Sequence, residues 1–426
     1  METIVPQHIK NMEWPTPPEQ EERFREGNLK QLILQRINYI KSVFVDEGKM
    51  EVRKLSPGGF AKGIPPGESA ISALATGASG NIFGGTGGSR AHFFFYSPLP
   101  DADLVVDVGV VAENARITAL AAHPDGRVFG STAALDGSSE GRIFAYIPCE
   151  YLFEAAIESC DPGEARKIMD TPPRDSVTAF VDDPCHSCGK IETLAVPVEG
   201  EGVASLVLCK ENTLLCGLSS KKGILFTYDL ATGAVAQKGQ ADEVRDYSSA
   251  LITGTDGHVY GAKSEGRIFR YNTETDRIED TGVHAPSLKG RQLYNKVEVW
   301  AKDEFSKIIY GGTSDGLLFT FDTASMKITT LGKPVKEDRI RALTVGADGR
   351  VYGIGGEENG CAHLFCYNPE TRDMRDLGMP MACVEEHWYG YQFAAAATGK
   401  WGEVYLGESD RISHLFIYFP PINTRE

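Results

Sequence analysis

The chain has 426 residues, of which 42% are hydrophobic, and a net charge of −16 at pH 7. This length allows two or three ordinary domains or one large repeat fold, and the apolar fraction supports a sizeable core. The negative charge argues against binding to nucleic acid or to anionic membranes. The sequence contains no run of about 18 apolar residues, so no transmembrane helix is predicted. The first residues lack the pattern of a secretory signal. The nine cysteines form no small-domain disulfide framework, so reduced thiols and a cytoplasmic location are expected.

Residues 1–48 are expected to form a helical extension. Thr16 and Glu19 in "TPPE" have the spacing of a capping box, with proline in the first turn. Apolar residues from Leu29 to Phe44 then recur at helical spacing. This segment is interpreted as an amphipathic helix that packs on the rest of the chain. A helix that binds a protein partner is the alternative.

The remaining residues, 49–426, repeat a module of four short strands. A first apolar strand such as "ITALAA" (117–122) is followed by an Asp-Gly turn such as "PDGR" (124–127), a strong hairpin signal. The second strand usually ends in an aromatic residue followed by glycine, and the third carries two aromatic residues spaced by one. The aromatic-glycine pairs are Phe83-Gly84, Phe129-Gly130, Tyr260-Gly261, Tyr310-Gly311 and Tyr352-Gly353.

The modules predict an all-β fold, a seven-bladed β-propeller of four-stranded blades. Seven sets of the first three strands are present, but only six fourth strands follow them. The segment 50–58, "MEVRKLSPG", resembles a fourth strand and is expected to complete the last blade, which closes the ring and removes exposed sheet edges. Insertions are expected at about 149–165 and 174–202, although 149–202 is long enough to contain an eighth, degenerate blade.

One position of the repeat, two residues before the third-strand phenylalanine, is often basic. It is occupied by His92, Arg142, Ile224, Arg267, Leu317, His363 and His414. The position follows the loop between the second and third strands, on the face where propellers usually bind ligands. The histidines are interpreted either as partly buried residues bonded to neighbouring loops, or as ligands of a substrate or of a divalent metal.

The loops that lead into the first strands of the later modules gather arginine, tyrosine and histidine on the same face. Arginine suits bidentate binding of carboxylate, and tyrosine offers a flat surface for a sugar ring. Candidate substrate-binding residues are Arg245, Arg291, Arg339, Tyr389, Tyr391, His92 and His414, and candidate catalytic residues are His387 or His363 as base and Tyr294 or Tyr247 as acid. The alternative is a set of solvated loops with incidental aromatic residues.

The stretch "DPCHSCGK" (183–190) supplies a candidate metal site. Cys185 and Cys188 form a Cys-x-x-Cys pair with His186 between them. A redox disulfide and plain thiols are the alternatives. No cofactor is required by these patterns, and a divalent metal, Zn or Mn, is the one considered. The glycine-rich stretches at 84–89 and 353–360 lead into no helix and lack a phosphate-loop ending, so no nucleotide site is expected.

The module "DGRVYGIGG…HLFCYNPETRDMRDLG" (348–378) resembles blades of the quinoprotein-like and kelch-like propellers, over roughly 50–420. Within that class, the histidine, tyrosine and arginine residues of the ligand face resemble those of propeller lyases such as the oligogalacturonate, ulvan and virginiamycin B lyases. The resemblance implies β-elimination on an anionic, uronate-type saccharide. The alternative is a non-catalytic propeller that binds a ligand or a protein. Only four tryptophans are present, which argues against a quinone cofactor.

Overall fold

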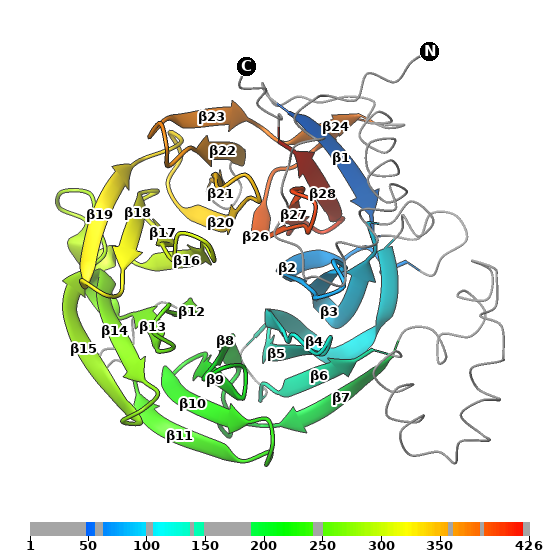
Figure 1. Ribbon diagram of the computed structural model, residues 1–426. Coiled ribbons are helices and arrows are strands. Elements are labelled where there is room, and N and C mark those ends of the chain that lie inside the picture. Colours follow the sequence, from blue (N-terminus) through cyan, green and yellow to red (C-terminus); the bar gives the residue numbers. More distant parts are fainter. Residues whose placement is uncertain are drawn as a thin grey trace, which may run out of the picture.

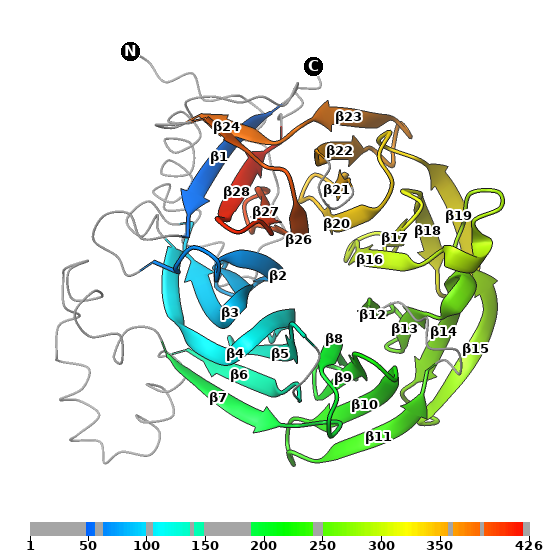
Figure 2. The same cartoon turned by 180° about the vertical axis from the view of Figure 1, so that it is seen from behind.

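The computed structural model describes residues 48–55, 63–98, 105–136, 140–148, 189–241, 250–356, 361–383 and 387–420. These residues form β-sheets arranged radially around a central axis, so the predicted all-β propeller is confirmed (Figure 1). Figure 2 shows the same ring from behind. The predicted helical segment within 1–47 and most of the two predicted insertions lie outside the described residues. No helix in the described part is long and apolar enough to cross a membrane.

Five of the sheets have four strands each, in which each strand pairs with its neighbour in the module. The first of these sheets contains β8 (Val203–Cys209), β9 (Leu214–Ser219), β10 (Ile224–Asp229) and β11 (Val235–Gln240). The next contains β12 (Leu251–Thr253), β13 (Val259–Ala262), β14 (Arg267–Asn272) and β15 (Arg277–His284), and is followed by β16 (Val297–Lys302), β17 (Ile309–Thr313), β18 (Leu318–Asp322) and β19 (Lys327–Gly332). The fourth contains β20 (Ile340–Val345), β21 (Val351–Gly355), β22 (His363–Tyr367) and β23 (Met374–Gly378), and the last combines β26 (Phe393–Thr398), β27 (Val404–Glu408) and β28 (His414–Phe419) with β1 (Lys49–Lys54).

The sixth sheet has six strands and corrects the predicted count of seven separate blades. It contains β2 (Ala70–Thr76), β3 (Ile82–Tyr96), β4 (Val105–Ala122), β5 (Val128–Ala134), β6 (Ile143–Ile147) and β7 (Lys190–Ala195). The beginning of β3 pairs with β2 and its end with β4, while the end of β4 pairs with β5. The strands of the first two predicted modules are therefore present. Strand β3 folds back on itself within the first module, where the Phe83 and Phe93 rings lie 5.8 Å apart. Strand β4 runs from the fourth strand of the first module into the first strand of the second, which joins the two modules in one hydrogen-bonded sheet.

The predicted closure of the ring by an N-terminal strand is confirmed. Strand β1 pairs antiparallel with β28, from Lys49 opposite Phe419 to Lys54 opposite His414. Both strands contribute to the core, because Met50 is 1% exposed and Phe416 is fully buried. The edge of β28 is thereby paired with chain from the other end of the sequence, which leaves β28 unavailable for intermolecular pairing.

The aromatic-glycine landmark has a packing cause. Gly311 of β17 lies opposite Phe319 of β18, and a Cβ added to Gly311 would lie 2.2 Å from Cζ of Phe319. The same close approach relates Gly130 to Phe144 and Gly353 to Phe365. The phenylalanine ring of the third strand lies over the glycine of the second strand, where no side chain blocks it. The recurring glycine and the recurring phenylalanine of the repeat therefore form one contact.

The hydrophobic core is divided into layers between neighbouring sheets. Phe365 and Tyr367 of β22 pack toward Ala301 and Tyr310 of the preceding sheet. The alternate residue Leu364 packs toward the next sheet, with Phe393. This alternation follows from the two-residue period of a strand. Smaller elements are the ribbon of β24 (Met381–Cys383) and β25 (His387–Tyr389), and the single-turn helices η2 (Ser264–Gly266) and η3 (Gln292–Tyr294).

Candidate functional site

Six innermost segments of the sheets have a β-bulge near their first residues, whereas β12 pairs with β13 without one. The pairing register shifts by one residue in β2, in the second half of β4, and in β8, β16, β20 and β26. A bulge changes the direction of one side chain and interrupts the ladder at that point. The six bulge residues, which we call the axial rim, are Ser72, Thr118, Ala204, Glu298, Arg341 and Ala394, and all are half-buried.

Three rim side chains contact the next innermost segment around the ring. Ser72 Oγ donates to the carbonyl oxygen of Ile117 at 2.6 Å. Thr118 Oγ1 donates to that of Val203 at 2.7 Å. Glu298 accepts from Nη2 of Arg339 at 2.8 Å. These contacts connect neighbouring modules close to the axis, so the rim has a structural role on this part of the ring.

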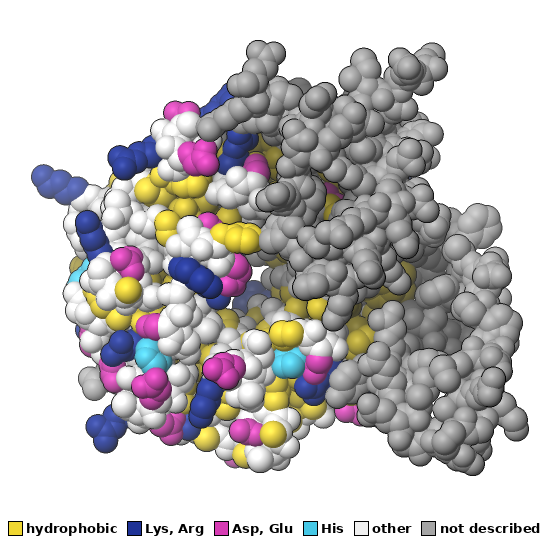
Figure 3. Space-filling view, viewed as in Figure 1, with side chains coloured by type: hydrophobic (Ala, Val, Ile, Leu, Met, Phe, Trp, Pro, Cys, Tyr) yellow, Lys and Arg dark blue, Asp and Glu magenta, His cyan; other side chains and the backbone are white. Residues whose placement is uncertain are grey.

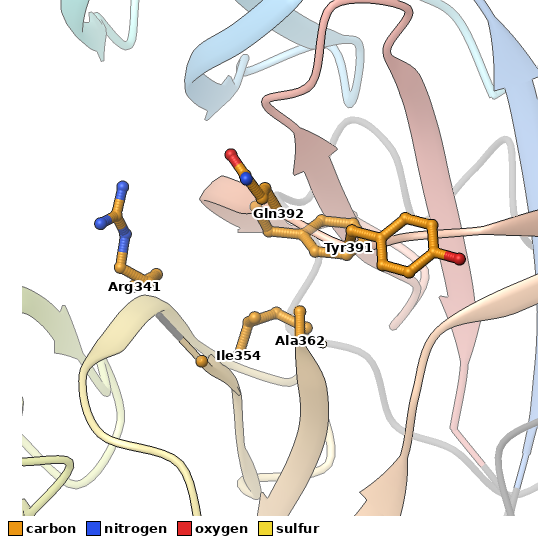
Figure 4. A pocket seen from close by; sticks show the side chains of 7 residues that line it. Arg341, Ile354, Ala362, Tyr391 and Gln392 are labelled. Carbon is orange, nitrogen blue, oxygen red and sulfur yellow. The ribbon is translucent and has the colours of Figure 1, made fainter. Parts of the chain in front are cut away.

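Arg341 is the rim residue that lines a pocket, between β20 and β26. The pocket has about 230 Å³ of empty volume, part of it open to solvent, and is lined by Arg341, Ile354, Gly356, Ala362, Tyr391, Gln392 and Phe393. In the close view, the amide of Gln392 extends toward the side on which the Arg341 guanidinium lies, whereas the Tyr391 phenol points away from it (Figure 4). The enclosed part of this space is about 10 Å³, which holds about one water molecule, so the pocket suits one polar group of a ligand that lies mostly outside it.

Two predicted substrate-binding arginines are engaged in ion pairs. Arg291 bonds through Nε to Asp315, at 2.9 Å, and through Nη1 to Asp338, at 2.7 Å. The Asp315 side chain is 1% exposed, and Lys333 also pairs with Asp338. Arg339 pairs with Glu298. The carboxylate partners of both arginines come from this chain, so these arginines hold loops together rather than presenting open anion sites.

The three repeated histidines are also bonded to carboxylates. His363 Nδ1 lies 2.9 Å from both oxygens of Asp376. His92 lies between Asp107 and Glu68, and His414 Nδ1 lies 2.7 Å from Glu408. His92 and His414 are 3% and 2% exposed. The structural interpretation of these histidines therefore fits best, with carboxylates in place of the expected loop carbonyls.

Charge and burial have opposite effects on the carboxylates around these histidines. Hydrogen bonds from Arg90, and further ones from Ser89 and His92, lower the pKa of Glu68 to about 2, against the opposing effect of burial. Glu408 behaves differently, because its burial raises its pKa and outweighs the hydrogen bonds from His414. The carboxylate beside His92 is thus firmly ionised, whereas the one beside His414 is held less strongly in the charged form.

The other candidates are placed as follows. Tyr294, Tyr391 and Tyr389 are exposed, at 74%, 48% and 39%, and of these Tyr391 lines the pocket. His387 lies on β25, but its side chain lies outside the described part. The residues Arg245, Tyr247, Cys185, His186 and Cys188 fall in 242–249 and 149–188, outside the described residues. Within the described ranges, no cluster of three or more histidine, cysteine or acidic residues has the arrangement of a metal site.

Sequence reasoning missed the partners of the repeated basic position. Asp107, Asp280 and Asp376 each precede a glycine by two residues, and each accepts a bond from the amide of that glycine. The basic residues opposite them are His92, Arg267 and His363, with Arg267 at 3.9 Å from Asp280. The recurring Asp-x-Gly in the fourth strands was a usable signal. Gln392 gave no such signal, because its place in the pocket depends on packing between sheets.

Comparisons with known proteins agree on the fold. No family model matches the chain, and no curated protein matches its sequence. Among solved structures, virginiamycin B lyase from Staphylococcus aureus superposes with a TM-score of 0.60 at 10% identity, covering 88% of this chain and 99% of that one.

The space-filling view shows basic and acidic side chains next to each other around the central opening of the present chain (Figure 3).

Two further neighbours are extracellular domains from B. thetaiotaomicron, of proteins described as the hybrid two-component systems BT4673 and BT3049. Both have a TM-score of 0.52, at 13% and 11% identity, and cover 86% and 83% of this chain. The matches span 39% and 40% of those longer chains. At such identities the comparisons show a shared propeller architecture and leave activity and location to be tested.

Proposed function

We propose that the chain is a ligand-binding propeller, and that it holds an anionic, uronate-type saccharide at the axial rim. The observation that carries this proposal is the pocket between β20 and β26, where the cationic side chain of Arg341 and the amide of Gln392 lie on the same side. A guanidinium forms charge-assisted bonds with a carboxylate, and an amide donates to a hydroxyl or carboxylate oxygen.

The charges of the preceding loops are balanced. Arg291, Lys333 and Arg339 pair with Asp315, Asp338 and Glu298, so the preference for an anion proposed here comes from the Arg341 guanidinium that lines the pocket. The exposed ring of Tyr391 adds an apolar surface beside the pocket.

The position of His363 argues against a role for this residue as a catalytic base at the pocket. His363 shares a face of β22 with Phe365 and Tyr367, which pack toward the preceding sheet. The pocket opens on the other face, where Ile354 packs toward the next sheet. Alternation along the strand therefore directs the imidazole away from the pocket. As a general base it would have to lie within hydrogen-bond reach of the substrate proton.

A β-elimination lyase is the second candidate function. It is favoured by β25, because this strand carries His387 and leads directly into Tyr391, Gln392 and Phe393 of the pocket. In that reaction a base at His387 removes the proton next to the uronate carboxylate, and Arg341 stabilises the charge that develops on the carboxylate. A carbon–carbon double bond then forms as the glycosidic C–O bond at the next carbon breaks, and the leaving oxygen takes a proton from Tyr294, Tyr247 or water. A cytoplasmic location, a Zn or Mn ion at Cys185 and Cys188, and a protein partner of the N-terminal segment are further predictions that await tests.

The binding proposal is tested by calorimetric titration of the full chain with a panel of oligouronates and matched neutral oligosaccharides. We expect preference for the uronates, and Arg341→Met is expected to weaken binding about 10- to 100-fold, as fits the loss of a charge-assisted hydrogen bond worth about 1.5–3 kcal/mol. Arg277→Met is the matched control, because Arg277 is exposed on β15, an outer strand. Equal affinities for wild type and both variants would contradict the proposal, and absence of binding across the panel would favour a protein-binding scaffold.

The two candidate functions are separated by following the ultraviolet absorbance of an unsaturated product. A lyase forms this product, and His387→Gln is then expected to lower the turnover by about 100-fold or more while binding is retained. A chain that binds uronates and forms no product is a binding propeller. Product formed equally well by His387→Gln would rule out the role proposed for this histidine.

A further inference from the structure

The first and last sheets of the ring meet at a contact between two loops, which we call the seam. It joins Gly67–Ser69, before β2, to Arg411–Ser413, before β28. The amide of Gly67 donates to the carbonyl oxygen of Arg411 at 2.7 Å, Ser69 Oγ donates to the same oxygen at 3.3 Å, and the amide of Ser413 donates to Ser69 Oγ at 3.1 Å. The seam therefore closes the ring between segments 342 to 344 residues apart.

His92 connects the first sheet to this seam. Its Nδ1 lies 2.9 Å from an oxygen of Asp107 on β4, and its Nε2 lies 2.9 Å from an oxygen of Glu68. Glu68 is the middle residue of the seam loop Gly67–Ser69. The His92 side chain is 4% exposed. One buried imidazole thus bonds the fourth strand of its own module on one side and the seam loop on the other.

The bonding of His92 depends on its protonation. A neutral imidazole carries one N–H, whereas an imidazolium carries two. Both ring nitrogens lie at hydrogen-bond distance from a carboxylate, so the imidazolium alone donates to Asp107 and Glu68 at once. After loss of a proton, one nitrogen lone pair faces a carboxylate oxygen. Such a contact between two acceptors is unfavourable in a buried site.

The other charges at the site keep Glu68 ionised in both states of His92. Arg90 donates to both oxygens of Glu68 at 3.0 Å, and Ser89 donates to one of them at 2.5 Å. Arg90 itself also interacts with Glu113 and Asp107. Because Glu68 keeps these partners and stays ionised, deprotonation of His92 removes one of its two donated bonds, to Glu68 or to Asp107, and so interrupts the connection between the seam loop and β4.

We propose that His92 is a proton-dependent closure element of the propeller. As an imidazolium it bonds Asp107 and Glu68 and holds the seam loop in place, and its deprotonation loosens the contact between the first and last sheets. This role is independent of the rim pocket and of any ligand bound there.

The direction of the pH effect follows from the pKa of His92. Burial lowers this pKa, but the hydrogen bonds and charges of Asp107 and Glu68 outweigh burial and raise it above the usual value. A raised folded-state pKa contributes stability that is fully present below the unfolded value of about 6.5 and is lost as the pH rises through the folded value. The seam is therefore closed in mildly acidic solution and loosens in alkaline solution.

The test is hydrogen exchange of the Gly67 and Ser413 amides, measured between mildly acidic and alkaline pH and corrected for the intrinsic exchange rate at each pH. In the wild-type chain, the protection of these two amides from exchange is expected to fall with rising pH. The total fall is about tenfold for each pKa unit by which His92 is more basic in the closed seam than in the open seam. His92→Gln is expected to give protection that no longer varies with pH. His363→Gln is the matched control, because His363 occupies the equivalent position and pairs with the equivalent aspartate, but lies in another sheet.

Two outcomes would overturn the proposal: wild-type protection that does not change with pH after correction, or the wild-type pH dependence retained in His92→Gln. If His92→Gln does not fold, Glu68→Gln provides a second measurement. Removal of one carboxylate lowers the pKa of His92, so the loss of protection at Ser413 is expected at a lower pH than in the wild type. An unchanged midpoint in Glu68→Gln would equally contradict the proposed role.

Discussion

The contact between glycine and phenylalanine inside each module predicts the effect of Gly311→Ala. A Cβ at this position would lie 2.2 Å from Cζ and 2.5 Å from Cε1 of Phe319. The ring has little room to move, because Phe319 is fully buried and Trp300 packs against it with ring centroids 5.5 Å apart. Overpacking of this kind costs about 1–3 kcal/mol. The gain of about 0.4–1 kcal/mol from restricting the unfolded chain offsets part of it.

We therefore expect Gly311→Ala to lower the free energy of unfolding by about 1–2 kcal/mol. The assay is denaturant unfolding followed by circular dichroism and by tryptophan fluorescence. Phe319→Leu, which shortens the ring to a side chain that leaves space for the new methyl group, is the partner variant. It is itself expected to be destabilising, by about 1–2 kcal/mol. The double variant is expected to lose at least about 1 kcal/mol less than the sum of the two single losses. A stability of Gly311→Ala within about 0.5 kcal/mol of the wild type, or strictly additive losses, would refute the packing explanation.

Two further predictions concern the thiols and the ring closure. Burial raises the pKa of Cys209 to about 12 and that of Cys216 well above its usual value, whereas Cys361 is exposed. A thiol reagent at neutral pH is therefore expected to label Cys361 and to spare the other two cysteines in the native chain. Equal labelling of all three would contradict their difference in burial. Met50→Ala on β1 is expected to lower the free energy of unfolding by about 2–5 kcal/mol, because Met50 is 1% exposed in the core of the last sheet. Thermal unfolding measures this loss, with Lys49→Ala as the exposed control. Equal unfolding temperatures for the two variants would show that β1 adds little to the closure of the ring.

Much of the fold was predictable because its signals are local. The Asp-Gly turns, the aromatic-glycine pairs and the paired third-strand aromatics each report on a few neighbouring residues, and they located the modules from 70 to 419. The resemblance of 50–58 to a fourth strand also predicted the pairing of β1 with β28. The predicted number of separate sheets was wrong, because the continuity of β4 between the first two modules depends on its pairing partners and not on local sequence.

The site was predicted less well than the fold. Residue type suggested arginines available to a ligand, yet Arg291 and Arg339 are engaged by Asp315, Asp338 and Glu298. Those carboxylates lie 24 to 47 positions away along the chain, and their contacts arise only when neighbouring loops pack. An arginine suited to a ligand and an arginine in an ion pair look the same in sequence.

The sequence by itself determined the modules, their turns and the origin of the closing strand, because hairpin formation and aromatic packing on glycine are interactions between residues close in the chain or equivalent in the repeat. The tertiary structure alone decided which charges neutralise one another, which face of β22 carries His363, and that Arg341 and Gln392 border one pocket. These features depend on distances between different sheets, and such distances are set by how the whole ring packs around its axis.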